Sequence, residues 1–407
     1  MIYKKLNHCN CCKKKNHLNL LSIKNQPVLT ANNSNKLKSL YKNKFINLNL
    51  FICKNCLNIQ LKEAINPKIL YDGFNYETSI TLGLVNHFKL LANNLIKKFK
   101  LSKNDNVLDI GSNDGSFLKN FVIKKIKVLG IDPAKKIAQK ATKNGINTLP
   151  IFFNYNSSKK IKKKYGKFKV ITSFNTFANI FNFDEFILGI KNLLTDDGVF
   201  IVETQYGVDV LKKKLIDTVY HEHINYFTIK SLQELFKRFG LIVDDYKFLP
   251  NKGGSIRIYV KKDIKIKKKM KLEKIIKKEM NYLNLKKIGK FSHQLNEIKF
   301  QLQKLINKIK NSKNEKIYAF GSSVGSTTLI NFFNLNDYIE YIYDDKPLTN
   351  LLNFKHKSIK IKNSESMLRE SNIIILAWRY TNNIIKKHSG KKLKFITFLP
   401  KIKIINK

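Results

Sequence analysis

The sequence is poor in arginine, in acidic residues and in long apolar runs. Only four of its 77 basic residues are arginine, against 29 acidic residues, and the formal net charge is +48. A charge of this size first suggests nucleic acid or an anionic membrane as the partner. Arginine, however, is the residue preferred for bidentate contacts to phosphates and bases, and it is nearly missing. Because Lys, Asn and Ile all have A/T-rich codons, we attribute most of the charge to genome drift and expect no nucleic-acid partner.

The chain also lacks a segment suited to crossing a membrane. Its longest apolar run covers residues 373–378, whereas a membrane-spanning helix needs about 18 such residues. Lys4 and Lys5 are not followed by a long apolar stretch, so a secretory signal is not expected. We therefore expect a cytoplasmic protein whose thiols stay reduced. The composition sets no oligomeric state, and a monomer is compatible with it.

The distribution of residue types predicts four segments in an α/β protein. A length of 407 residues corresponds to two or three domains of about 150 residues. All five cysteines precede residue 57, which indicates a small N-terminal module over residues 1–70. Apolar strands alternate with helical patterns over 71–260 and again over 315–407, as in Rossmann-like domains with a parallel sheet. The expected strands cover residues 106–110, 128–131, 170–173, 198–202, 317–320, 339–343 and 373–377.

Residues 261–314 form a lysine-rich connector with almost no glycine or proline. Apolar residues recur there at helical spacing, for example Ile288, Phe291, Leu295 and Leu302. This pattern predicts one or two amphipathic helices packed on the body of the protein. A helix that binds nucleic acid or a membrane surface is the alternative. The absence of arginine and of interleaved aromatics favours the packed helices.

Four cysteines form two pairs with the spacing of a metal site. Cys9 and Cys12 make one Cys-x-x-Cys pair, and Cys53 and Cys56 make the other. Two such pairs complete a tetrahedral four-thiolate zinc site, which has no open position and is therefore structural. Cys11 could compete with its neighbours for the metal. Reduced core thiols or disulfides are the alternatives to zinc.

A strand followed by a glycine turn and a helix predicts a cofactor site. Gly111 and Gly115 allow a ligand to approach the backbone at the helix N-terminus, and the dinucleotide pattern G-x-G-x-x-G is absent. Asp109 ends the strand and can face an amino group, whereas Asp132 ends the next strand and can hold a ribose. An amine, a ribose and no pyrophosphate describe S-adenosylmethionine. The residues expected to bind it are Asp109, Gly111, Asn113, Gly115, Asp132 and Asn175.

The densest group of ionisable residues covers positions 217–223. His221 and His223 would share one side of an extended segment and diverge on a helix. Their spacing does not match the zinc pattern H-E-x-x-H. Acid–base chemistry by a histidine, oriented by Tyr220 and Glu222, is one interpretation. The other interpretation is a structural loop whose polar side chains only form hydrogen bonds within the protein.

Taken together, these motifs resemble the sugar-nucleotide C-methyltransferase family of deoxysugar biosynthesis, over essentially the whole chain. Members of that family have an N-terminal zinc module, a central methyltransferase domain and a C-terminal Rossmann-like domain. The segments that carry the resemblance are the two cysteine pairs, residues 74–79, the cofactor loop with residues 131–133, and residues 220–223, 253–257 and 343–347.

The resemblance implies a reaction and a set of catalytic residues. His223 would act as the general base, with Tyr76, Tyr220 and Glu222 around the substrate. The expected substrate is a nucleotide-linked keto-deoxysugar, such as a thymidine diphosphate hexose. Deprotonation next to its ketone would give a carbanion that takes the methyl group of S-adenosylmethionine, and no metal takes part. The alternatives are methylation of oxygen or nitrogen, or a nucleic-acid-binding protein with a vestigial methyltransferase fold.

Three positions depart from the family pattern. Asn179 and Lys252 stand where the family usually has histidine, which leaves the identity of the sugar open. Gly325 and Ser326 replace a usual Lys-Gly pair, which leaves the contact of the C-terminal domain open. Arg257, in the Gly-Gly-Ser motif, is expected to place a fixed cation beside the site.

Overall fold

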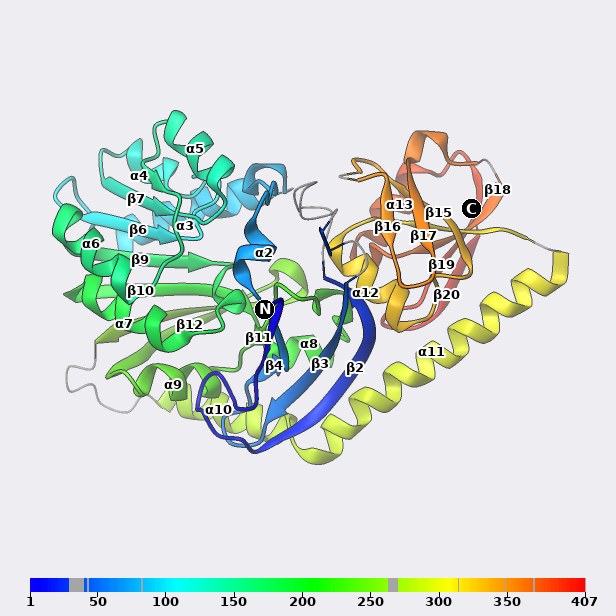
Figure 1. The fold of residues 1–407 in the computed structure, drawn as a ribbon, viewed down its shortest axis with the longest axis horizontal. Coiled ribbons are helices and arrows are strands. Elements are labelled where there is room, and N and C mark those ends of the chain that lie inside the picture. The colour runs from blue at the N-terminus through cyan, green and yellow to red at the C-terminus, as the bar shows by residue number, and fades with distance from the viewer. Residues whose placement is uncertain are drawn as a thin grey trace.

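The structure is a computed structural model that describes residues 1–28, 40–41, 44–81, 83–262, 270–313, 315–347, 349–368 and 370–406. Part of the expected helical connector, residues 263–269, lies outside the described residues. Figure 1 shows two α/β lobes, with the N-terminal strands between them and the long helix α11 running below towards the C-terminal lobe.

The first lobe is built on a seven-stranded sheet with the order β12-β13-β10-β9-β6-β7-β8. Neighbouring strands from β8 to β10 are parallel, and β13 joins β10 in the antiparallel sense. The four strands predicted for this lobe are confirmed, and three of them extend beyond the predicted ends. The strands are β6 (Asn106–Ile110), β7 (Lys127–Ile131), β8 (Thr148–Leu149), β9 (Phe168–Phe174), β10 (Leu194–Gln205), β12 (Leu241–Leu249) and β13 (Ser255–Lys262).

Alternate residues of these strands face two different cores, as the two-residue period of a strand requires. Val107 and Val170 pack with α3 (Leu84–Lys98) and α4 (Lys119–Val122). Leu108 and Ile171 belong to the other core, with α7 (Phe183–Leu193) and α9 (Ile229–Lys237). The sheet is thus covered by helices on both faces. The carboxyl ends of its parallel strands are the place where a ligand can bind, since the turns that follow these strands meet there.

The N-terminal strands form a four-stranded sheet with the order β11-β4-β3-β2. Its edge strand β11 (Asn225–Tyr226) comes from the segment that follows the histidine cluster and pairs with β4 (Ile59–Leu61). The other two strands are β2 (His17–Pro27) and β3 (Phe45–Cys53). A separate pair joins β1 (Tyr3–Lys5) to β5 (Glu63–Ile65). The N-terminal sheet is therefore completed by the central part of the chain.

Two helices occupy the described part of the lysine-rich connector, α10 (Met270–Tyr282) and α11 (Leu285–Lys313). The predicted apolar positions Ile288, Phe291, Leu295 and Leu302 are buried. Helix α11 contacts β2, where the Ser292 hydroxyl donates to the carbonyl of Leu20. The helix is thus packed on the body of the protein, as predicted.

The C-terminal lobe contains a second seven-stranded sheet with the order β16-β17-β15-β14-β18-β19-β20. Five central strands are parallel and the two edge strands are antiparallel. The prediction of a second Rossmann-like unit is therefore confirmed. Its strands are β14 (Ile317–Phe320), β15 (Ile339–Asp344), β16 (Leu351–Asn353), β17 (Ser358–Asn363), β18 (Glu370–Ile375), β19 (Lys392–Thr397) and β20 (Lys403–Asn406).

Helix α12 (Val324–Phe332) joins the C-terminal lobe to the rest of the protein by packing on β2 and on the 3₁₀ turn Ile216–Thr218. A Cβ built on Gly325 would lie 2.0 Å from the carbonyl oxygen of Asp217. The Thr328 hydroxyl donates to the carbonyl of Val219 over 2.7 Å. Glycine at position 325 is thus required for the close approach of this helix to the histidine segment.

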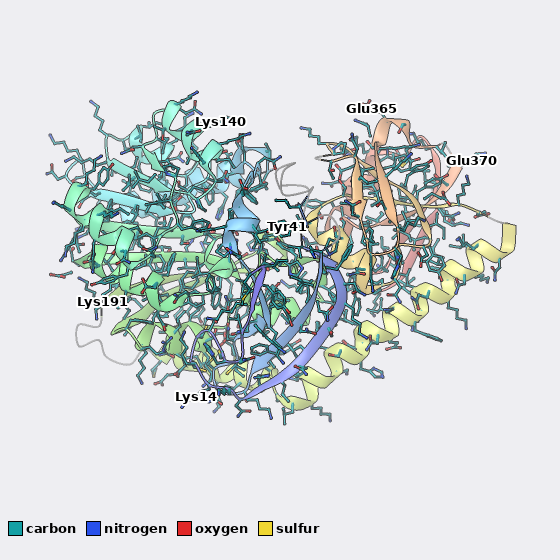
Figure 2. All side chains as sticks on the ribbon, viewed as in Figure 1. Lys14, Tyr41, Lys140, Lys191, Glu365 and Glu370 are labelled. Atoms are coloured by element: carbon teal, nitrogen blue, oxygen red, sulfur yellow. The ribbon has the colours of Figure 1, made fainter. Side chains whose placement is uncertain are left out.

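The described residues include no helix that is long and apolar enough to cross a membrane. Charged side chains such as Lys14, Lys140 and Lys191 project from separate parts of the surface (Figure 2).

We predict that Gly325→Ala destabilises the protein by about 1–3 kcal/mol, because the added methyl group overpacks the contact with Asp217. Chemical denaturation measures the change. Gly289→Ala in α11 is the matched control, since its Cβ would meet no atom of the described chain within 4 Å, and it should stabilise by about 0.5–1 kcal/mol. Equal effects of the two substitutions would contradict the close contact.

Candidate active site

A cavity of about 680 Å³ lies at the carboxyl ends of β6, β7 and β9. Three groups of residues line it: the glycine loop after β6, the segment 71–78, and residues 174–182 after β9. Lys4 and Lys68 of the N-terminal part and Lys252 of the β12–β13 turn also contribute. The cavity therefore lies where parallel α/β sheets bind their ligands.

Most of the residues expected to bind a cofactor line this cavity: Asp109, Gly111, Asn113, Asp132 and Asn175. Gly115 does not line it and instead packs on Ile146. Gly111 has φ +80°, and a Cβ there would lie 2.1 Å from the Thr176 hydroxyl oxygen. Glycine is therefore required at this position by its backbone conformation and by the close packing of Thr176.

Two buried carboxylates give the cavity its polarity. Thr172 donates to Asp109 over 2.7 Å, and burial raises the pKa of Asp109 to about 7. Asp132 accepts the backbone N–H groups of Asn113 and Ala134 at 2.9 and 2.8 Å, and burial raises its pKa to about 6. Neither carboxylate has an ion pair within the described part of the chain. A ligand that offers a cation and hydroxyl groups would satisfy both.

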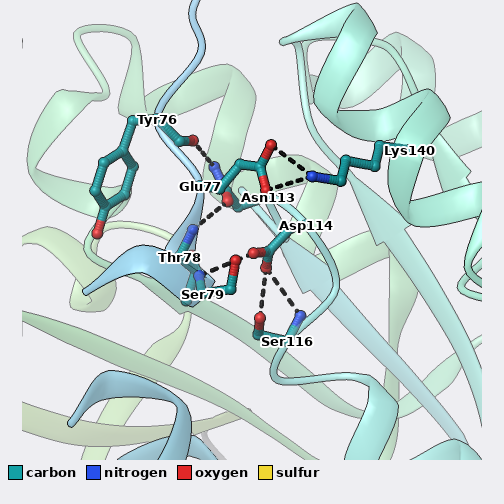
Figure 3. Close-up of polar contacts among 8 residues, drawn as sticks. All are labelled: Tyr76, Glu77, Thr78, Ser79, Asn113, Asp114, Ser116 and Lys140. Atoms are coloured by element: carbon teal, nitrogen blue, oxygen red, sulfur yellow. Dashed lines mark hydrogen bonds and ion pairs between the residues drawn. The ribbon is translucent and has the colours of Figure 1, made fainter. Parts of the chain in front are cut away.

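The segment 76–79 lies across the glycine loop (Figure 3). The Asn113 side chain accepts the backbone N–H of Thr78 at 2.7 Å and donates to the carbonyl of Tyr76 at 2.9 Å. Asp114 accepts the N–H of Ser79 at 2.9 Å. The side-chain amide of Asn113, expected to face the cofactor, thus holds the segment that carries Tyr76 over the cavity.

His223 is fixed in one tautomer by its two hydrogen bonds. Its Nδ1 lies 3.0 Å from the carbonyl oxygen of Thr218, which can only accept, so Nδ1 carries the hydrogen. Its Nε2 then accepts the Tyr220 hydroxyl over 2.9 Å. Burial and the charge of Lys252 lower the pKa of His223 to about 3. The imidazole is therefore neutral at pH 7, with its free electron pair at Nε2.

The other residues of the histidine cluster lie around this pair. Residues 221–222 form a turn rather than an extended strand. His221 is buried there, and burial lowers its pKa to about 4. Tyr220, Glu222 and His223 are not among the residues that line the large cavity. Lys252, which does line it, is close enough to influence His223.

Tyr71, the last residue of helix α2 (Pro67–Tyr71), was not among the site residues expected from the sequence. Tyr71 lines the cavity and its hydroxyl accepts the side-chain amide of Asn179 at 2.7 Å. Burial raises the pKa of Tyr71, and the charge of Glu222 adds to this effect. No local sequence pattern marked Tyr71 as a site residue.

Two basic residues near the site differ in their pairing. Arg257, expected to be a fixed cation beside the site, is buried and forms an ion pair with Glu203, which His87 also contacts at 2.9 Å. Arg257 is not a lining residue. Lys252 has φ +54° in its turn, and among the described residues no ion pair is formed by its ammonium group. Desolvation in the cleft and the charge of Arg379 lower the pKa of Lys252 to about 8.

The four predicted metal ligands come together. The Sγ atoms of Cys9, Cys12, Cys53 and Cys56 all lie within 4.8 Å of one another. Separations of 3.4 Å for Cys9–Cys56 and 3.5 Å for Cys12–Cys53 exceed the ~2.05 Å of a disulfide. Cys11 is buried outside this group. The cluster can therefore hold a zinc ion with four thiolates, as predicted.

The comparisons with known proteins agree with the motifs. Residues 86–245 match the family described as a methyltransferase domain, and residues 250–400 match the C-methyltransferase C-terminal domain. C-methyltransferase NovU of Streptomyces niveus is 32% identical over 212 residues, which is 52% of this chain and 50% of that protein. The chain thus matches about half the length of this curated relative. The resemblance stated from the motifs is confirmed at the level of these domains.

Solved methyltransferase structures also match part of the chain. A magnesium protoporphyrin IX methyltransferase from Synechocystis PCC 6803 with bound SAM is 11% identical, with a TM-score of 0.34 over 44% of this chain and 80% of that one. An S-adenosylmethionine-dependent methyltransferase from Clostridium acetobutylicum is 14% identical, with a TM-score of 0.35 over 44% and 92%.

We predict about one zinc ion per purified chain by elemental analysis. Cys12→Ser should lose most of the metal because it removes one of four thiolates, whereas Cys11→Ser should keep it. A fully folded protein without metal would contradict the zinc site.

We also predict that S-adenosylmethionine binds more tightly as the pH rises from about 5.5 to 8, since its amine favours the ionised form of Asp109. Asp109→Asn should bind more weakly and lose most of this pH dependence in calorimetric titrations. Asp105→Asn, in a surface turn with Ser102, is the control and should keep the wild-type profile. An unchanged profile in Asp109→Asn would refute the assignment.

Proposed function

We propose that this chain is an S-adenosylmethionine-dependent C-methyltransferase that acts on a nucleotide-linked keto-deoxysugar. The observation that carries the proposal is the match of residues 250–400 to the C-methyltransferase C-terminal domain, directly after a methyltransferase domain. Methylation of carbon rather than oxygen or nitrogen requires a base that removes a carbon-bound proton. We assign this role to His223, whose neutral imidazole carries a lone pair on Nε2.

Residues after β6 and β7 would hold the cofactor. Asp109 would face its amino group, Asp132 its ribose hydroxyls, and the backbone at Gly111 would pass along it. When bound, S-adenosylmethionine supplies a methyl group on a positively charged sulfur. The two buried carboxylates without ion pairs in the described chain support this fit, because a cationic ligand lowers the cost of their ionisation.

His223 and Tyr220 would both take part in the removal of the proton. The Thr218 carbonyl keeps the proton of His223 on Nδ1, so that Nε2 accepts a proton from the carbon next to the ketone. The substrate would displace the Tyr220 hydroxyl from Nε2. Burial raises the pKa of Tyr220, so its O–H stays protonated and can donate to the developing enolate oxygen. A positioned base typically contributes about 10²–10⁴ in rate, and a positioned donor about 10²–10³.

The remaining lining residues suit a small anionic substrate. A volume of about 680 Å³ falls within the range of pockets that enclose small-molecule ligands. Lys252 lines this cavity, and a diphosphate would provide a counter-charge for its ammonium group. Tyr76 lines the cavity and would lie beside the sugar, and Glu222 would approach the sugar from the histidine cluster. A reducing compartment, most simply the cytoplasm, would keep the cysteine thiols available for zinc.

We predict that wild-type protein transfers a labelled methyl group from S-adenosylmethionine to carbon in one of a panel of nucleotide keto-sugars. His223→Gln should lower turnover by about 10²–10⁴, since it removes the base, while cofactor affinity stays unchanged. His293→Gln, at an exposed position of α11, is the control and should keep full turnover.

NMR of the product identifies the methylated atom. A methyl group on oxygen or nitrogen would replace this proposal with the other class of methyltransferase. Wild-type turnover by His223→Gln would remove His223 from the mechanism.

A further inference from the structure

The metal-binding knuckle contains a buried asparagine that reaches the histidine segment. Asn10 lies between Cys9 and Cys12 and is 1% exposed. Its backbone N–H donates to the side chain of Gln60 at 2.7 Å, and its Nδ2 donates to Asn225 Oδ1 at 3.3 Å. Asn225 lies two residues after His223. Two positions separated by 215 residues in sequence are therefore joined by a buried hydrogen bond.

Asn225 uses both ends of its side-chain amide. Its Oδ1 accepts Asn10 and also Asn58, each at 3.3 Å. Its Nδ2 donates to the carbonyl oxygens of Ile180 at 2.9 Å and Ala178 at 3.3 Å. These two carbonyls flank Asn179, which lines the cavity. One side chain thus connects the knuckle, the histidine segment and the loop of Asn179.

The backbone at this point is tied to the same N-terminal sheet. Asn225 pairs with Gln60 between β11 and β4, and Leu61 donates its N–H to the carbonyl of Ile224 at 2.8 Å. The Thr228 hydroxyl donates to the carbonyl of Cys56 at 3.4 Å. Both cysteine pairs therefore contact the segment that follows His223.

Apolar side chains in place of these buried amides could fill the same space, and they would need no hydrogen-bond partners. A fully buried amide with four hydrogen bonds instead requires each partner at a defined position. Loss of any one partner leaves a buried polar group without a hydrogen bond, which costs about 1–3 kcal/mol. Such a network fixes the relative positions of the segments that it joins more sharply than apolar packing does. Its members Asn10, Asn58, Gln60 and Asn225 are all at most 1% exposed.

We propose that Asn225 and Asn10 are positioning residues, which transmit the geometry of the metal knuckle to the loops of His223 and Asn179. The four-cysteine site then has a second role besides stabilising the N-terminal module: it sets the orientation of the imidazole. The catalytic meaning of this link rests on the proposed function, whereas the link itself does not.

The test uses the metal-loaded, full-length protein labelled with ¹⁵N-histidine. In wild type, NMR should show His223 in the single tautomer with hydrogen on Nδ1. Asn10→Ala should keep one metal ion per chain, yet shift the His223 nitrogens towards a tautomer mixture and speed amide exchange around residues 178–182 and 218–224. Asn16→Ala is the control, because Asn16 is an exposed asparagine shortly after the first knuckle, and it should change neither signal. Asn225→Ala should cause the same changes in the His223 tautomer and in amide exchange as Asn10→Ala, but larger ones.

Activity provides a second readout where a substrate has been found. Asn10→Ala should lower kcat about tenfold with cofactor affinity unchanged. A wild-type His223 tautomer in Asn10→Ala, with or without a lower melting temperature, would reduce the network to a structural role and overturn the proposal. The NMR signals can be measured without a substrate. If wild-type protein transfers no methyl group, the proposed function is refuted, and the NMR comparison still decides whether Asn10 positions His223.

Discussion

The hydrogen bond from His223 Nδ1 to the carbonyl oxygen of Thr218 is the interaction on which the site depends. It decides which ring nitrogen carries the hydrogen, and so leaves Nε2 as the only acceptor of the imidazole. The same carbonyl also accepts the Tyr226 hydroxyl at 2.9 Å. This bond selects one tautomer only if the backbone of residues 217–226 keeps a fixed conformation. That segment has almost no regular secondary structure of its own.

The three parts of the protein together hold that segment. The C-terminal lobe contacts it through Gly325 and Thr328 of α12 and through the ion pair of Arg379 with Asp217. The N-terminal sheet takes β11 as its edge strand, and the methyltransferase sheet supplies the cavity beside it. An irregular buried segment needs external partners for its backbone groups. This requirement explains why the parts flanking the methyltransferase sheet lie against one short loop.

Features set by neighbouring residues could be predicted from the sequence. The cysteine pairs, the glycine loop with Asp109 and the alternating strands and helices all depend on spacings of a few residues. Features set by distant contacts could not. Nothing local to Asn225 indicates an edge strand of the N-terminal sheet, and nothing local to Arg257 indicates its ion pair with Glu203. The turn at residues 221–222, in place of an extended segment, is likewise not indicated by the local sequence.

If the fixed imidazole of His223 removes a proton from carbon, the enzyme should exchange that hydrogen with solvent even without methyl transfer. The substrate would be incubated in deuterated water with S-adenosylhomocysteine in place of the methyl donor, and the carbon next to its ketone followed by NMR. Our account predicts that wild-type protein exchanges this hydrogen and that His223→Gln exchanges it at least a hundredfold more slowly. Equal exchange rates in the two proteins would contradict it.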